Sequence, residues 1–180
     1  MIQEYGSINA FVSELHAAAL RDQGDTAMLT AVKPALLCLA RSTSWRSPRL
    51  YECDAAQGFG VTVLHEDPDR SLWLVAVSWL PGRGAEPHNH GTWAVVAGVE
   101  GEENNIFWRR REGRLDREGE QTIGPGKAVG FLPQDIHSVI NEGPRTTLSL
   151  HVYGRNLNCV ERSQFDPATG EERPFKLRVQ

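Results

Sequence analysis

The sequence predicts a mainly β fold with a helical segment ahead of it. Two observations carry this prediction. Apolar residues recur at three- and four-residue steps in the first part of the chain, as an amphipathic helix requires. From residue 42 onward, short apolar segments instead alternate with Gly, Pro, Asp and Asn. Many short strands separated by turn residues are typical of an antiparallel sandwich or barrel.

Residues 1–41 are expected to form a helical cap. Apolar residues recur at helical spacing from residue 8 to residue 19, and Ser7 is the expected N-cap of this helix. A second helix is expected to begin near Asp25 or Thr26. Pro34 predicts a break or a kink in it, because proline lacks the N–H donor and clashes with the preceding turn.

Residues 42–180 are expected to form a β-barrel and C-terminal strands. Turn signals such as Asp-Pro-Asp at 67–69 and Gly-Pro-Gly at 124–126 separate the apolar segments. The strands are expected at residues 50–53, 60–65, 71–80, 92–98, 105–110, 114–117, 127–132, 138–141, 146–153 and 159–165. A length of 180 residues suits a single domain, residues 1–180, with the change near residue 42 as an internal boundary.

Charge and composition argue against several classes of partner. The chain has 19 Lys+Arg against 23 Asp+Glu, whereas nucleic acids and anionic membranes are bound by clustered positive charge. No apolar run approaches the roughly 20 residues that span a bilayer. The first residues lack signal-peptide features. We therefore expect a cytoplasmic protein, a monomer or small homo-oligomer, with no nucleic acid or membrane partner.

Histidines gather between residues 88 and 151. His88 and His90, spaced i and i+2, would point to the same face of a strand. Their ring nitrogens can converge on one ion at about 2.0–2.2 Å. Taken alone, the pair is equally consistent with two solvated imidazoles. His137 follows a Gly/Pro-rich turn and is expected on a neighbouring strand facing the same interior, which favours a metal site.

A second polar pattern lies on the expected strand 146–153. Ser149, His151 and Tyr153 would share one face of it. Inside a barrel, three polar groups need hydrogen-bond partners, and a chain from hydroxyl to imidazole to phenol satisfies all three. The alternative is an edge strand whose polar face lies in water.

In this order, H-x-H, a later His and S-x-H-x-Y resemble the motifs of the cysteine dioxygenase-type thiol dioxygenases of the cupin superfamily. General cupin motifs would cover residues 82–101 and 124–141, and the Phe-Asp-Pro-Ala-Thr-Gly stretch at 165–170 is also similar to that family. The resemblance implies a double-stranded β-helix, or jelly-roll barrel, behind the helical cap. Ala94 stands where many cupins have a glutamate ligand, which implies a three-histidine site.

The resemblance also implies a chemistry. One Fe(II) per chain would be held by His88, His90 and His137. The outer relay would be formed by Ser149, His151 and Tyr153. The reaction would add both atoms of O2 to the sulfur of a small thiol, cysteine or a related mercapto acid, to give a sulfinate. Residues 93–96 contain no cysteine, so no Cys–Tyr thioether cofactor is expected, as in many bacterial relatives.

The substrate pocket is less well defined by the pattern. The family binds the substrate carboxylate with an Arg or Gln on an early strand, and residues 59–65 contain neither. Candidates to replace it are His65, Arg83 and Arg155, and Trp93 is expected to line the cavity because it directly follows the metal motif. Other functions stay open: a C–C bond-cleaving dioxygenase, a zinc-dependent hydrolase or lyase, and a non-catalytic cupin sensor.

Overall fold

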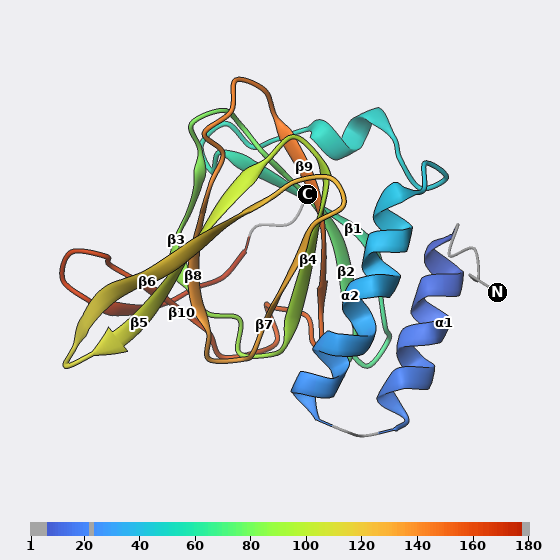
Figure 1. The fold of residues 1–180 in the computed structure, drawn as a ribbon, viewed down its shortest axis with the longest axis horizontal. Coiled ribbons are helices and arrows are strands. Elements are labelled where there is room, and N and C mark those ends of the chain that lie inside the picture. The colour runs from blue at the N-terminus through green and yellow to red at the C-terminus, as the bar shows by residue number, and fades with distance from the viewer. Residues whose placement is uncertain (1–6, 22–23, 178–180) are drawn as a thin grey trace.

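A computed structural model describes residues 7–21 and 24–177. Within these ranges two α-helices and a 3-10 turn precede the strands (Figure 1). The helical elements are α1 (Ile8–Ala19), α2 (Asp25–Arg41) and η1 (Pro48–Tyr51). The strands are β1 (Phe59–Glu66), β2 (Trp73–Trp79), β3 (Gly84–His88), β4 (Ala94–Glu100), β5 (Glu103–Arg111), β6 (Arg114–Ile123), β7 (Ala128–Phe131), β8 (Ile136–Ile140), β9 (Thr147–Tyr153), β10 (Ser163–Phe165) and β11 (Glu172–Pro174).

The two helices begin where the sequence predicts. The Ser7 hydroxyl caps α1 by accepting a hydrogen bond from the Ala10 N–H, and α2 starts at Asp25. The predicted break at Pro34 is wrong, because α2 runs without interruption to Arg41. Pro34 lies on the exposed side of the helix, where water can satisfy the carbonyl that loses its N–H partner. Neither described helix is long and apolar enough to cross a membrane.

The strands form two antiparallel sheets that face each other. The five-stranded sheet has the order β1-β2-β9-β4-β7, and the six-stranded sheet has the order β11-β10-β3-β8-β5-β6. From β2 to β10, each strand lies in the opposite sheet from the strand before it. The β5–β6 hairpin is the exception, because both of its strands lie in the six-stranded sheet. This alternation is the jelly-roll, or double-stranded β-helix, arrangement. The predicted mainly β fold with an N-terminal helical cap is therefore confirmed.

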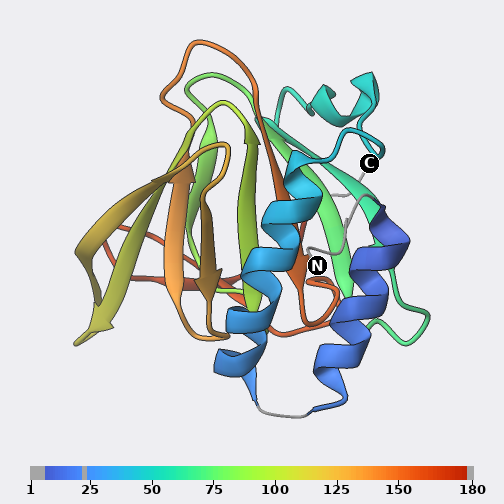
Figure 2. The same cartoon turned by 45° about the vertical axis from the view of Figure 1, so that its right-hand side comes forward.

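The helices cover the outer face of the five-stranded sheet (Figure 2). Strand alternation then divides the apolar residues into two cores. Leu148, Leu150 and Val152 of β9 pack towards the helices, in a core that also contains Leu36 of α2. Tyr153 points the other way, into the second core between the two sheets. The polar face of β9 therefore lines the interior of the barrel.

Several strand predictions need correction. Of residues 159–165, only Ser163–Phe165 form a strand, and β11 lies beyond the predicted strands. Residues 50–53 form the end of η1 and an extended link, because Pro48 at the first helical position favours a helical turn. The strand expected to carry His88 and His90 is β3, which begins at Gly84 and ends at His88. Its pairing with β8 makes it a strand. Strand β6 extends well beyond the predicted residues 114–117, to Ile123, as the exposed half of a hairpin with β5.

A candidate metal centre and a buried relay

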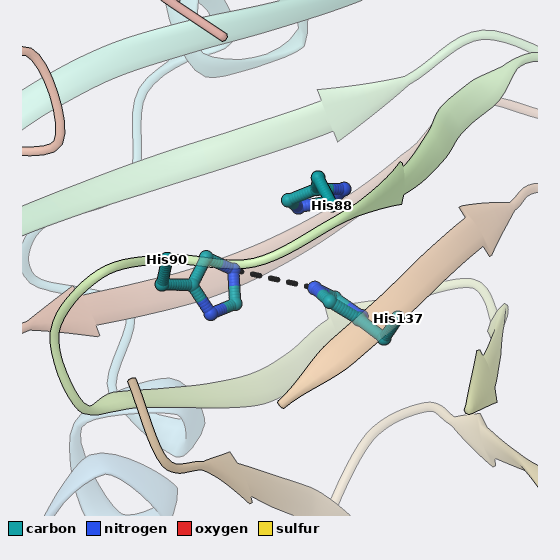
Figure 3. A group of neighbouring side chains, drawn as sticks. All are labelled: His88, His90 and His137. Carbon is teal, nitrogen blue, oxygen red and sulfur yellow. Dashed lines mark hydrogen bonds between the residues drawn. The ribbon is translucent and has the colours of Figure 1, made fainter. Parts of the chain in front are cut away.

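Three histidines meet between the two sheets (Figure 3). His88 is the last residue of β3, and its cross-strand partner is His137 in β8. The third histidine, His90, lies in the loop after β3, so the prediction that both residues of the H-x-H pair sit on one strand is wrong. The expectation that His137 faces the same interior from a neighbouring strand is confirmed.

The loop that carries His90 is held on both sides. Asn89 exchanges hydrogen bonds with Ser163 of β10, its N–H donating to the carbonyl at 3.1 Å and its Oδ1 accepting from the Ser163 N–H at 2.8 Å. The Gly91 N–H donates to the Pro133 carbonyl at 3.1 Å. Gly91 has a φ of 65°, and a Cβ there would lie 2.3 Å from the Glu161 carbonyl oxygen. Glycine is therefore required to turn the chain and place His90 inside.

The ring nitrogens are arranged as metal ligands would be. The donor atoms of the three histidines all lie within 4.8 Å of one another, and the Nε2 atoms of His90 and His137 are 3.3 Å apart. Two nitrogens bound to one ion at about 2.1 Å, at angles of about 90–110°, lie about 3.0–3.4 Å apart. The observed separation therefore suits two ligands of one ion, without rearrangement of the strands.

Outer partners fix the orientation of two of the rings. His88 Nδ1 donates to the Glu86 carbonyl at 2.8 Å, and His137 Nδ1 donates to Asn105 Oδ1 at 3.0 Å. In both rings Nε2 is left as the free electron-pair donor, which is how metal-binding histidines are commonly held. His90 Nδ1 is buried and has no partner among the described residues.

Burial keeps these imidazoles neutral. Desolvation lowers the pKa of His88 to about 4, and lowers the pKa of His90 and of His137 well below the ordinary value. Metals bind the neutral form of histidine, so the cluster needs no deprotonation at neutral pH. Three neutral ligands leave the full charge of a divalent ion in place, and that charge favours an anionic ligand.

The hydrogen-bonded order predicted for β9 is present. Ser149 Oγ lies 2.9 Å from His151 Nε2, and His151 Nδ1 lies 2.9 Å from the Tyr153 hydroxyl. All three residues are buried. Burial lowers the pKa of His151 to about 3 and raises the pKa of Tyr153, so both are neutral at physiological pH. The three hydrogen-bonded side chains can therefore transfer protons, although none of them is charged at rest.

The histidine cluster and the relay face one cavity of about 30 Å³. His90 and Tyr153 are adjacent there, with ring centroids 5.3 Å apart. Phe175 and Leu177, which follow β11, lie over the same cavity. The Phe175 ring packs edge-on against His88, with centroids 5.5 Å apart, so the C-terminal segment forms a roof on the site.

Sequence reasoning missed a buried arginine in this cavity. Arg162 is only 5% exposed, and its guanidinium lies over the Phe175 ring, 4.1 Å from the centroid. Its Nε and Nη2 have no hydrogen-bond partner among the described residues. Desolvation lowers its pKa to about 10, so it remains charged at neutral pH. No pattern in the expected strand 159–165 marks this arginine as inward-facing, because its burial depends on the roof packed above it.

The residues predicted for the substrate pocket lie elsewhere. Trp93 packs on the helix side of the five-stranded sheet, because its neighbour Ala94 takes the inward position. His65 pairs with Asp67 at 2.8 Å, beside the α1 helix rather than the cavity. Arg83 donates to the Ala56 carbonyl outside the barrel, and Arg155 is exposed. None of the four lines the cavity that holds the histidine cluster.

Comparisons with known proteins give limited sequence similarity. No protein-family model matches the chain. A protein of Pyricularia oryzae described as low-density lipoprotein receptor-related protein 1 is 29% identical over 140 residues, which is 76% of this chain and 42% of that protein. The chain thus spans less than half the length of this curated relative.

Solved structures are similar at low identity. A protein from Klebsiella pneumoniae with a double-stranded β-helix domain is 15% identical over 68% of this chain and 91% of its own, with a TM-score of 0.49. Oxalate oxidase bound to the substrate analogue glycolate is 15% identical over 61% of this chain and 59% of its own, with a TM-score of 0.49. A cupin domain of a transcriptional regulator from Enterobacter cloacae is 20% identical over 54% of this chain and 96% of its own, with a TM-score of 0.41. These likenesses concern the fold alone.

Proposed function

We propose that this chain is a cupin thiol dioxygenase of the cysteine dioxygenase type. It would use Fe(II) and O2 to convert a small thiol into its sulfinate, with both oxygen atoms added to sulfur. One observation carries the proposal: a three-histidine cluster, a hydrogen-bonded chain ending in a phenol and a buried arginine all face the same cavity. A three-histidine site that cleaved C–C bonds would give the relay no evident role.

Each group has a distinct task in this proposal. The Nε2 atoms of His88 and His137, with a ring nitrogen of His90, would hold the ion. A ferrous ion held there would supply the electrons that activate dioxygen. Tyr153 would hydrogen-bond the reacting atoms, and the apolar wall and roof of the cavity would exclude water.

Arg162 suggests the chemical class of the thiol. A buried guanidinium with two unpaired groups is costly unless a ligand supplies acceptors. A carboxylate is the acceptor that matches the fork of an arginine side chain. A mercapto acid would place its thiolate at the ion and its carboxylate at Arg162, whereas a thiol without a carboxylate would leave the guanidinium unpaired.

Oxygen uptake tests the proposed reaction. Ferrous-loaded protein should consume about one O2 per thiol and form sulfinate with a mercapto acid such as 3-mercaptopropionate, cysteine or mercaptosuccinate. Cysteamine, which lacks a carboxylate, should react less efficiently. An oxygen electrode and mass spectrometry with 18O2 would measure uptake and the two incorporated atoms. The proposal would be contradicted by stoichiometric zinc that iron cannot replace, together with no oxygen uptake with any thiol.

Arg162 should control the KM for the carboxylated thiol. Arg162→Lys keeps the charge but loses the fork, and should raise the KM for 3-mercaptopropionate by about tenfold or more, since charge-assisted pairs contribute about 1.5–3 kcal/mol. The KM for cysteamine should change little. Arg155→Lys is the matched control, because this exposed arginine lies outside the cavity. Equal effects of Arg162→Lys on both thiols would remove Arg162 from substrate binding.

A further inference from the structure

The buried relay has a fourth member that the S-x-H-x-Y pattern does not contain. Glu103, the first residue of β5, is 2% exposed, and its Oε2 accepts a hydrogen bond from the Ser149 hydroxyl at 3.2 Å. Ser149 Oγ is in turn 2.9 Å from His151 Nε2. A continuous path of hydrogen bonds therefore runs from a carboxyl group on the six-stranded sheet to the Tyr153 phenol at the cavity.

The charge of Glu103 fixes the direction of every hydrogen bond in this path. An ionised carboxylate only accepts, so the Ser149 O–H donates to it. Ser149 Oγ must then accept from His151 Nε2–H, which leaves His151 Nδ1 as an acceptor for the Tyr153 O–H. A protonated Glu103 can donate to Ser149 Oγ, and the order then reverses: Nδ1 carries the hydrogen and donates to the phenol oxygen, and the Tyr153 O–H becomes free to donate to a ligand.

We propose that Glu103 is the terminal proton acceptor of this path, and that it takes up the proton which a thiol loses when it binds in the cavity. The identity of the ligand as a thiol rests on the function proposed above. Glu103 does not touch the ligand in this proposal. It acts through the other three residues, and it sets whether Tyr153 accepts a hydrogen bond from the cavity or donates one into it.

The proton balance of the transfer closes. A proton leaves the thiol sulfur for the phenol oxygen, and the hydrogen of the phenol moves to His151 Nδ1. The hydrogen on His151 Nε2 moves to Ser149 Oγ, and the hydroxyl hydrogen moves to Glu103. One S–H bond has been exchanged for one carboxyl O–H bond. The path ends with a thiolate, a neutral Glu103, the Nδ1–H tautomer of His151 and a Tyr153 O–H available to the ligand.

The surroundings of Glu103 suit a proton acceptor that works near neutrality. Desolvation raises its pKa to about 7, opposed by its contacts with Ser149 and with the Trp79 indole of β2. On β6 its cross-strand partner is the apolar Ile123. No ion pair within the described ranges involves Glu103, and Tyr153 is the ionisable group whose pKa its charge raises.

The tautomer of His151 reports the state of Glu103 without turnover. In 15N-histidine-labelled protein loaded with Zn(II), the ring nitrogens of His151 should exchange protonated and unprotonated chemical shifts as pH is lowered through neutrality. Nε2 should carry the hydrogen at high pH and Nδ1 at low pH. Glu103→Gln should abolish this pH dependence, and Glu100→Gln, at an exposed position, should retain it. A tautomer in the wild-type protein that does not change with pH would overturn the proposal.

Proton release on ligand binding tests the same inference in a second way. When 3-mercaptopropionate binds Zn(II)-loaded protein above neutral pH, the wild type should keep the thiol proton. Glu103→Gln and Ser149→Ala, which interrupt the path at adjacent links, should each release about one proton more per chain to the buffer. Calorimetry in buffers of different ionisation enthalpy measures the difference. Equal release by all three proteins would refute the inference, whereas absent oxygen uptake would refute only the dioxygenase assignment.

Discussion

Replacing His137 by alanine should abolish stable metal binding. The substitution removes one of the three histidines that we propose as ligands, the one whose ring is oriented by Asn105. Loss of an outer partner alone commonly weakens metal affinity 10–100-fold, so loss of a ligand should weaken it by more than about 100-fold. Metal analysis after gel filtration of ferrous-loaded protein would show the result. The rise in Tm that metal gives the wild type should also disappear, since only a ligand that binds the folded state stabilises it.

A matched variant separates ligand loss from damage to the fold. His16→Ala also removes a histidine, but His16 lies on α1, half exposed and paired with Asp67. It should keep the metal and the metal-dependent rise in Tm. The centroids of the His137 and Phe131 rings are 4.0 Å apart, so His137→Ala also loses packing contacts. For this reason His90→Ala provides a second test of the site. Metal retained at wild-type affinity by both cavity variants would show that the cluster is not the metal site.

Replacing Tyr153 by phenylalanine should preserve the metal but lower turnover by about 100-fold or more, the range in which a positioned proton donor or acceptor contributes. The phenol oxygen is the end of the relay that faces the cavity, and it lies 2.9 Å from His151 Nδ1. Its removal leaves the ring that packs against Trp73 in place, with centroids 5.7 Å apart in the wild type. Steady-state oxygen uptake at saturating thiol measures the change.

Tyr51→Phe supplies the control for this experiment. Tyr51 also donates a hydrogen bond from its hydroxyl, to Glu100 at 2.6 Å, but on the outside of the barrel. It should turn over at the wild-type rate. Full activity of Tyr153→Phe with normal iron content would exclude the relay from the reaction, whatever its role in the fold.

Local periodicity explains why much of the site was predictable. The period-two pattern of β9 placed Ser149, His151 and Tyr153 on one face, and burial of that face favoured hydrogen bonds among the three residues. His88 and His90 favoured a metal site only together with His137, and the prediction that both lie on one strand is wrong. His90 reaches the cluster from a loop, which is shaped by contacts to distant segments.

Features that depend on distant segments escaped prediction. Glu103 meets Ser149 across 46 positions of sequence, and Arg162 becomes buried only when the C-terminal segment lies over it. Trp93 was assigned to the cavity because it follows the metal motif. The face on which a side chain lies is set instead by the alternation of residues along the strand. A difference of one residue exchanges the inside of a sheet for its outside, and Ala94 holds the inward position.

The roof over the cavity has a consequence for the kinetics of ligand binding. Phe175 and Leu177 line the cavity of about 30 Å³, so a ligand that enters on this side would do so as the C-terminal segment moves. Association would then be gated: the observed rate should rise with ligand concentration and level off at the rate at which the segment opens. The Phe175–Arg162 contact makes this gate sensitive to charge, because an anion paired with the guanidinium would remain beneath the closed segment.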